Sequence, residues 1–353
     1  MDIFIQSAAQ ISIQNPLCED WFENPIAHTE DYNRSIEPDY KPFINPMAAR
    51  RMGKIIKRAI ATSISAIQQA GAKKVDAIIT GTGLGCIENT EKFLSAMVKE
   101  GEQLLQPTYF MQSTHNTISS QIALNQKCNG YNCTYSHRGT SFECGLSDAL
   151  LQMQLGRISN ALVGGHDEMT PDYFNMLGKI GYWKKDEINE TILKQSNSEG
   201  SFAGETAVSL FLGTNKTEKS LCRLRDVELL YKASAEKMSE TIQNMLKQAN
   251  LQYSDLDAIM LGVSGDGEND TIYKEFAQKN FPQTPIAWYK HIFGESFTAS
   301  AFGVYAAAEC LAKKIIPANL LYTNGNAVKN PQNILIYNHF QNKDHSLILL
   351  SKA

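Results

Sequence analysis

The sequence lacks the features that identify membrane and secreted proteins. It has no run of about 18 apolar residues, so no membrane-spanning helix is expected. Its start, residues 1–14, has no basic stretch followed by a continuous apolar core, and is read as a first β-strand rather than a signal peptide. Its seven cysteines are scattered without a CxxC pair. This argues against a disulfide framework and favours a reducing cytoplasm.

Charge and motif content exclude further classes. The formal net charge is -4 and long basic runs are missing, which argues against nucleic acid as the main partner. One local exception is the basic stretch of residues 49–58. The glycine-rich "GTGLGC" is not followed by a phosphate-binding lysine, and no spacing of His, Cys and carboxylates suits a metal. We therefore expect no metal and no cofactor.

The pattern of apolar residues predicts alternating strands and helices. The chain has 353 residues, 43% hydrophobic and 20% charged, as in an ordinary globular protein. Helical spacing from Pro46 to Ala70 predicts one long amphipathic helix capped by Asn45, and Pro107 is placed in a loop. Buried strands that end in glycine turns alternate with such helices. This order predicts a layered α/β fold with a largely parallel sheet.

The second half of the chain repeats the order of the first. "LDAIMLGVSGDG" resembles "VDAIITGTGLG", and the Ala-rich stretch of residues 293–314 is taken as one helix and as the counterpart of residues 113–124. The halves join in the region of residues 175–203. We expect an N-terminal half at 1–190 and a C-terminal half at 191–353.

Seven landmarks occur in an order and spacing that resemble a known family. They are "GTGLG", "PTYFMQST", "TYSHRGTSFECGL" with "GRISNALVGG", "EGSFAGETA", "LGVSGDG", "KHIFGES" and "NILIYNHFQNKDHSLIL". From about Arg51 onward the chain resembles the β-ketoacyl synthases of the thiolase superfamily. The resemblance implies a five-layered αβαβα fold of two pseudo-symmetric halves that works as a dimer.

The resemblance also implies three catalytic positions, and all three are changed here. Ketosynthases use a cysteine at the start of a buried helix and two histidines that stabilise oxyanions. Counted back without a gap from "GG", the cysteine position falls on Gly139, and the first histidine position falls on Ser264. In "KHIFGE" the family lysine is kept as Lys290, while the second histidine position holds Glu295. None of these three residues can perform the family chemistry.

Another residue could still supply a nucleophile. Ser141 lies near the expected helix start, and His137 is a conceivable base for it. Cys144 is a second candidate. Their ordinary interpretations are a helix cap for the serine and a small buried hydrophobic residue for the cysteine.

Further positions follow from the same resemblance. Phe340 falls on the phenylalanine that gates the acyl pocket, but its flanking glycines are replaced. Leu84 and Met111 fall where related enzymes line the acyl tunnel near the dimer interface, although both are equally well explained as core residues. Arg50 and Arg51 suit docking of an acidic carrier protein that holds the acyl chain on phosphopantetheine, or a simple solvated face.

These losses from an otherwise complete scaffold resemble a chain length factor. Such a pseudo-ketosynthase subunit pairs with an active ketosynthase in type II polyketide, aryl polyene or flexirubin pigment systems, completes the interface and shapes the acyl tunnel. The strand "YNCTYS" is then expected at the subunit interface. Two alternatives stay open: an active acyltransferase with a relocated nucleophile, and a non-catalytic homodimeric acyl-binding scaffold.

Overall fold

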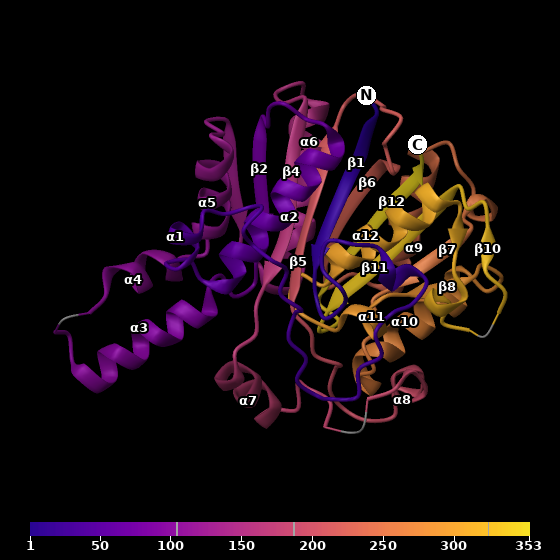
Figure 1. Ribbon diagram of the computed structural model, residues 1–353. Coiled ribbons are helices and arrows are strands. Elements are labelled where there is room, and N and C mark those ends of the chain that lie inside the picture. The colour runs from indigo at the N-terminus through magenta and orange to yellow at the C-terminus, as the bar shows by residue number, and fades with distance from the viewer. Residues whose placement is uncertain (104, 186–187, 324) are drawn as a thin grey trace.

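The computed structural model describes residues 1–103, 105–185, 188–323 and 325–353, which form a mixed α/β fold (Figure 1). The strands are β1 (Ile3–Ile11), β2 (Ala77–Gly81), β3 (Tyr131–Tyr135), β4 (Asn160–Asp167), β5 (Thr206–Gly213), β6 (Cys222–Tyr231), β7 (Ala258–Leu261), β8 (Ile286–Trp288), β9 (Ile315–Ile316), β10 (Val328–Lys329), β11 (Asn333–Phe340) and β12 (Asp344–Lys352). The α-helices are α1 (Pro46–Ala49), α2 (Lys54–Ala70), α3 (Ile87–Glu100), α4 (Pro107–Ser113), α5 (Thr117–Gln126), α6 (Ser141–Gln154), α7 (Pro171–Lys179), α8 (Glu190–Gln195), α9 (Ala235–Gln248), α10 (Gly267–Asn280), α11 (Lys290–Phe293) and α12 (Ser300–Lys313).

The main sheet contains two sets of five strands with the same order. Its ten strands run β3-β2-β4-β5-β1-β6-β12-β11-β7-β8. In the first set β2 pairs in parallel with β3 and β4, while β5 is antiparallel to β4 and β1. In the second set β7 pairs in parallel with β8 and β11, while β12 is antiparallel to β11 and β6. An antiparallel contact between β1 and β6 joins the two sets, so the expected pseudo-symmetric halves are present.

Alternation of apolar residues along each strand builds five layers. On β4, Leu162 faces the hydrophobic cluster under α2 and α5, while Ala161 and Val163 face a central cluster that contains α6 and α12. On β11, Ile336 faces the same central cluster and Leu335 faces the cluster under α9 and α10. The order is therefore helices, sheet, central helices, sheet, helices. This confirms the thiolase-like αβαβα fold.

The boundary between the halves stays a proposal. Residue 190 lies at the start of α8, whereas β5 follows it and pairs with β1 and β4. The strand order would place the division later, between Gly213 and Cys222. The expected counterpart of the Ala-rich helix in the first half was wrong. The helix α12 corresponds in position to α6, and it does not correspond to residues 113–124.

Three local expectations were wrong. The stretch from Pro46 to Ala70 is two helices, because the chain turns at residues 50–53 and α2 begins after Gly53, whose extended backbone ends the turn. Pro107 begins α4 instead of lying in a loop. Proline suits the first turn of a helix because the N–H groups of that turn have no acceptor within the helix, so the N–H that proline lacks is not needed there. Residues 293–314 are not one helix, because Gly294 has φ +77° and separates α11 from α12.

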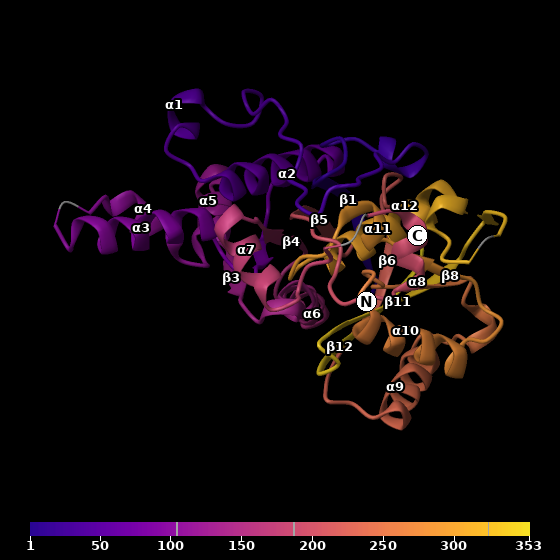
Figure 2. The same cartoon turned by 90° about the horizontal axis from the view of Figure 1, so that it is seen from below.

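The helices α3 and α4 form an arm that extends away from the body of the protein (Figures 1 and 2). Figure 2 shows this arm at the opposite end of the molecule from α9 and α10. None of the helices formed by the described residues combines the length and hydropathy that a bilayer crossing requires.

Candidate functional site

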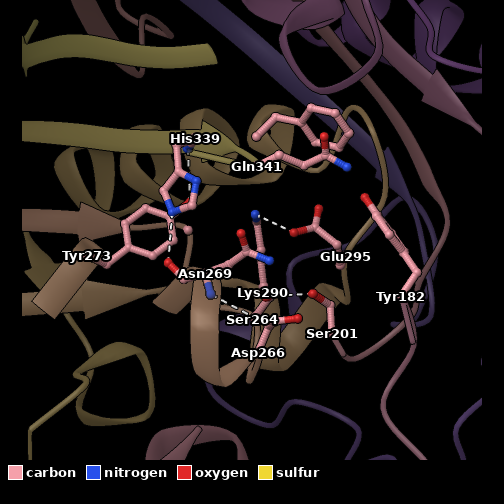
Figure 3. Close-up of a pocket in the computed structure, with 12 residues that line it drawn as sticks. Tyr182, Ser201, Ser264, Asp266, Asn269, Tyr273, Lys290, Glu295, His339 and Gln341 are labelled. Carbon is pink, nitrogen blue, oxygen red and sulfur yellow. Dashed lines mark hydrogen bonds and ion pairs between the residues drawn. The ribbon is translucent and has the colours of Figure 1, made fainter. Parts of the chain in front are cut away.

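The candidate site lies where β2, β3 and β7 end, beside the β11–β12 hairpin and α11. Figure 3 shows the polar side chains that meet there. The cavity that they enclose measures about 40 Å³, which is room for about three waters. Its lining comes from both halves of the chain: Tyr182, Ser201, Gly262, Ser264, Asp266, Asn269, Tyr273, Lys290, Glu295, His339, Phe340 and Gln341.

The side-chain position at Gly139 is occupied by another residue. Gly139 lies in a single 3-10 turn, residues 138–140, immediately before α6. An ideal Cβ at Gly139 would lie 2.4 Å from both Cβ and Cγ of Phe340. Real Cβ atoms do not approach other atoms so closely, so the phenylalanine ring fills the space that a side chain at 139 would need.

The tip of the β11–β12 hairpin holds Phe340 in this place. The N–H of Lys343 donates to the carbonyl of Phe340 at 3.1 Å, and Gln341 and Asn342 both have positive φ, +51° and +50°. This is the pattern of a type I′ turn, which favours glycine but is built here from two larger residues. The hairpin thus keeps a sharp turn without glycine.

The candidate nucleophile Ser141 is held by the backbone. Its hydroxyl donates to the carbonyl of Arg138 at 2.7 Å and accepts from the N–H of His137 at 2.8 Å. The imidazole Nδ1 of His137 instead lies 3.0 Å from the hydroxyl of Thr140. Ser141 therefore contacts the backbone N–H of His137, whereas the imidazole of His137 contacts the hydroxyl of Thr140.

Cys144 lies on α6, half-buried, one turn beyond Ser141. Burial raises the pKa of its thiol to about 11, and the neighbouring Glu143 adds to the increase. The thiolate is the nucleophilic form of cysteine, so this environment disfavours the reactive form of Cys144.

Ser264 is buried and fully engaged. Its hydroxyl lies 2.8 Å from that of Ser201, and its N–H donates to a carboxylate oxygen of Asp270 at 3.0 Å. Its carbonyl accepts from the N–H of Phe202 at 3.0 Å. Ser264 links the loop after β7 to the segment between the halves, and it lines the cavity.

Lys290 and Glu295 form a buried ion pair. Nζ of Lys290 lies 2.6 Å from Oε2 of Glu295, and the two side chains are 2% and 15% exposed. Burial raises the pKa of Glu295, while the charge of Lys290 acts in the opposite direction. The positive charge of Lys290 thus compensates the buried carboxylate of Glu295.

Asn338 connects this ion pair to the centre of the protein. Its Oδ1 accepts from Nζ of Lys290 and from the hydroxyl of Tyr273, both at 3.0 Å. Its amide donates to Oε1 of Glu143 at 3.3 Å. Glu143 is fully buried, also accepts from Ser346, and has its pKa raised by burial. Together these contacts form a continuous buried polar network.

Sequence reasoning missed Asn338, Glu143 and Tyr182. Asn338 interrupts the alternation of "ILIYNHF", which was the one available signal for it. Tyr182 comes from the segment between the halves and points its hydroxyl towards Glu295 (Figure 3). Nothing in the local sequence indicates that partner.

The other expected site residues lie on the side of β3 and the arm. Leu84 is half-buried and its N–H donates to Asp167 at 3.0 Å, whereas Met111 on α4 is 62% exposed and does not belong to the core. Arg50 and Arg51 are exposed and line a hollow of about 480 Å³ between α2 and α3. In the described part of the chain, no group of three or more His, Cys, Asp or Glu side chains could hold a metal ion.

Comparisons with known proteins relate part of the chain to a family. Residues 19–182 match the family model described as "Beta-ketoacyl synthase, N-terminal domain". No curated protein sequence matches the chain. Within residues 19–182 the chain therefore resembles the N-terminal domain of the β-ketoacyl synthases.

Solved structures resemble the chain along its whole length. "The ishigamide ketosynthase/chain length factor" has a TM-score of 0.85 and 16% identity, covering 100% of this chain and 99% of that one. A β-ketoacyl synthase from Burkholderia phymatum STM815 has a TM-score of 0.84 and 14% identity, covering 100% and 99%. The ketosynthase ApeO in complex with its chain length factor ApeC, from Xenorhabdus doucetiae, has a TM-score of 0.83 and 14% identity, covering 100% and 98%. At these identities the likeness concerns the fold.

Proposed function

We propose that this protein is a non-condensing ketosynthase-like subunit that pairs with an active β-ketoacyl synthase, in the manner of a chain length factor. The observation that carries the proposal is the ring of Phe340 in the side-chain position of residue 139. An acyl-enzyme needs a nucleophile with space around it for a tetrahedral intermediate. At Gly139 there is neither a nucleophile nor space.

The electrostatics of the site support the same proposal. Decarboxylation and condensation build negative charge on an enolate, which neutral or positive donors stabilise. Here Lys290 is committed to Glu295 at 2.6 Å and to Asn338 at 3.0 Å. A cavity of about 40 Å³ also has no room for an acyl chain.

An apolar face around β3 is the proposed interface with the active subunit. β3 is an edge strand of the ten-stranded sheet, and its residues are half-buried or exposed. Large hydrophobic residues, each more than a third exposed, occur on the arm and around this edge: Leu94, Val98, Phe110, Met111, Leu124, Tyr131, Leu151 and Leu155. Exposed apolar residues in such number around the open edge of β3 suit a permanent protein partner.

The hollow beside Arg50 and Arg51 is the proposed docking site for the acyl carrier protein. Lys54, Lys57 and Lys92 also line it, and Glu88 is the one acidic side chain among the described residues that line it. A cluster of cations suits an acidic carrier and the phosphate of its phosphopantetheine arm. By this proposal the partner supplies the catalytic cysteine and histidines in the cytoplasm, and this subunit shapes the acyl tunnel for a fatty acid-like or polyketide-like pigment.

Co-purification tests the pairing. The protein is expressed alone and together with each ketosynthase encoded near it, and the mass of each assembly is measured by light scattering. We expect a stable heterodimer with one of them. Met111→Asp should weaken it, whereas Ile180→Asp, an equally drastic change at a 75% exposed residue of the segment after α7, should not. A homodimer that ignores every ketosynthase would instead support the scaffold alternative.

Intact-mass spectrometry tests the absence of chemistry. The isolated chain is incubated with a labelled acyl carrier protein, and we expect no covalent acyl group on it. Loading of the isolated chain that is abolished by Ser141→Ala or Cys144→Ala would contradict the proposal and establish a relocated nucleophile.

A further inference from the structure

A groove lies between α9 and α10, at the end of the molecule opposite the arm (Figure 2). It measures about 280 Å³, at the small end of the range of ligand pockets. The two helices form its walls, and Tyr337 of β11 and His345 of β12 contribute from the sheet below. The described residues that line this groove and those that line the polar cavity of the candidate site are different sets, so the groove is a separate feature.

The inner surface of the groove is aromatic. The ring centroids of Phe276 and Tyr337 are 4.1 Å apart at an angle of 34°. The imidazole of His345 lies nearly parallel to the Tyr337 ring, at 6.1 Å and 13°. At the rim, Glu275 and Lys279 are exposed and carry opposite charges. The groove therefore suits a flat, uncharged aromatic ring.

Two histidines occupy paired positions on β11 and β12, where His339 lies opposite His345. His339 is satisfied at both ring nitrogens: Nε2 lies 2.9 Å from the carbonyl of Asn269, and Nδ1 accepts from the N–H of Asn342 at 3.3 Å. His345 is satisfied at one end, where Nδ1 lies 3.0 Å from the hydroxyl of Tyr337. Its Nε2 is buried and has no hydrogen-bond partner among the described residues. Such a nitrogen is costly to leave unpaired, so a ligand group that bonds it gains affinity.

The chemistry of His345 specifies that ligand group. Burial lowers the pKa of its imidazole, which is therefore neutral at pH 7 and has one N–H and one acceptor nitrogen. If the hydroxyl of Tyr337 donates to Nδ1, then Nε2 carries the proton. If Nδ1 donates to that hydroxyl, then Nε2 is an acceptor. A ligand hydroxyl both donates and accepts, so it satisfies Nε2 in either tautomer.

We propose that this groove binds a small uncharged phenol, whose ring packs on Phe276 and Tyr337 and whose hydroxyl bonds Nε2 of His345. The site goes beyond the proposed function and does not depend on pairing with a ketosynthase. It shares one element with the candidate site, because Asn342 of the β11–β12 hairpin lines the groove while Gln341 lines the polar cavity. A bound phenol thus contacts the hairpin at a position separate from the candidate site.

Calorimetric titration with 2-naphthol and 2-methylnaphthalene tests the hydrogen bond, since the two probes differ only in the hydroxyl. His345→Phe keeps an aromatic ring and removes Nε2. It should weaken 2-naphthol binding about ten-fold and leave 2-methylnaphthalene binding nearly unchanged. If the substitution weakens both probes equally, or neither of them, the hydroxyl does not bond His345 and the proposal is wrong.

A second variant locates the site without disturbing the core. Ala235 is an exposed residue at the start of α9 and lines the groove, so Ala235→Trp should block it and abolish binding of both probes. Ala48→Trp is the matched control, because it makes the same change at an exposed alanine of α1. Binding that survives Ala235→Trp, or no binding to the wild-type protein, would refute the site. No ketosynthase is present in these titrations, so their failure is distinct from failure of the proposed function.

Discussion

From the contact between Gly139 and Phe340 we predict how much Gly139→Ala changes the free energy of unfolding. Gly139→Ala adds one methyl group at a point 2.4 Å from Cβ and Cγ of the phenylalanine, where something must shift. The ring is half-buried at a hairpin tip, so it can move at the expense of its packing. Overpacking of this kind destabilises a fold by about 1–3 kcal/mol.

The second variant relieves the clash. Phe340→Ala alone loses part of the burial of a phenylalanine, about 1–2 kcal/mol for a half-buried ring. In the double variant the new methyl group occupies vacated space, so the combined loss should be smaller than the sum by about 1–2 kcal/mol. Urea unfolding of the four proteins, followed by circular dichroism, measures this coupling.

Gly178→Ala is the matched control. Its Cβ would meet nothing within 4 Å, and the residue lies within the helix α7. Alanine there should stabilise the protein by about 0.5–1 kcal/mol. If Gly139→Ala is as harmless as this control, or if Phe340→Ala does not rescue it, the ring of Phe340 does not occupy the side-chain position of residue 139.

Three further outcomes are expected. Burial raises the pKa of Glu309 to about 7, so the folded state loses stability as the pH rises from about 4.5 to 7. The variant Glu309→Gln should therefore stabilise the protein by about 3 kcal/mol at pH 8 and by little at pH 4. Thermal melts at both pH values measure this difference. Lys290→Met leaves Glu295 unpaired and should destabilise by about 3–5 kcal/mol, whereas adding Glu295→Leu should recover most of that loss in urea unfolding. The variant Gly139→Cys should neither accept an acyl group nor catalyse condensation, because Phe340 covers the new thiol. Intact-mass spectrometry and product analysis test this. Condensation by this variant would mean that the histidine positions are misassigned.

Much of the fold was predictable because local patterns set it. Buried apolar runs identified β2 and β7, and glycine turns marked the ends of these strands. The break of the helix at residues 50–53 was missed because Gly53 is compatible with a helix interior at modest cost. The pairing of α12 with α6 depends on which layer each helix enters, and local pattern does not determine that.

The site was predictable in part. The resemblance to ketosynthases directed attention to Gly139, Ser264, Lys290 and Glu295, and the structure brings the last three to one cavity, with Gly139 beside Phe340. The placement of the Phe340 ring against Gly139 could not be predicted, because the two residues are about 200 positions apart in the sequence. The role of Asn338 likewise depends on partners from other elements.

The hairpin turn at Gln341 and Asn342 has a consequence for the history of the site. Left-handed backbone is unfavourable by roughly 1–2 kcal/mol per non-glycine residue, and the chain maintains it at two successive positions. Under the proposed function, catalysis would need a cysteine, two histidines and a flexible loop together. The first of these steps, cysteine at Gly139, collides with Phe340 and lowers stability before any activity is gained. Gain of catalysis by single substitutions would therefore begin with a loss of stability, which favours the present state of the site.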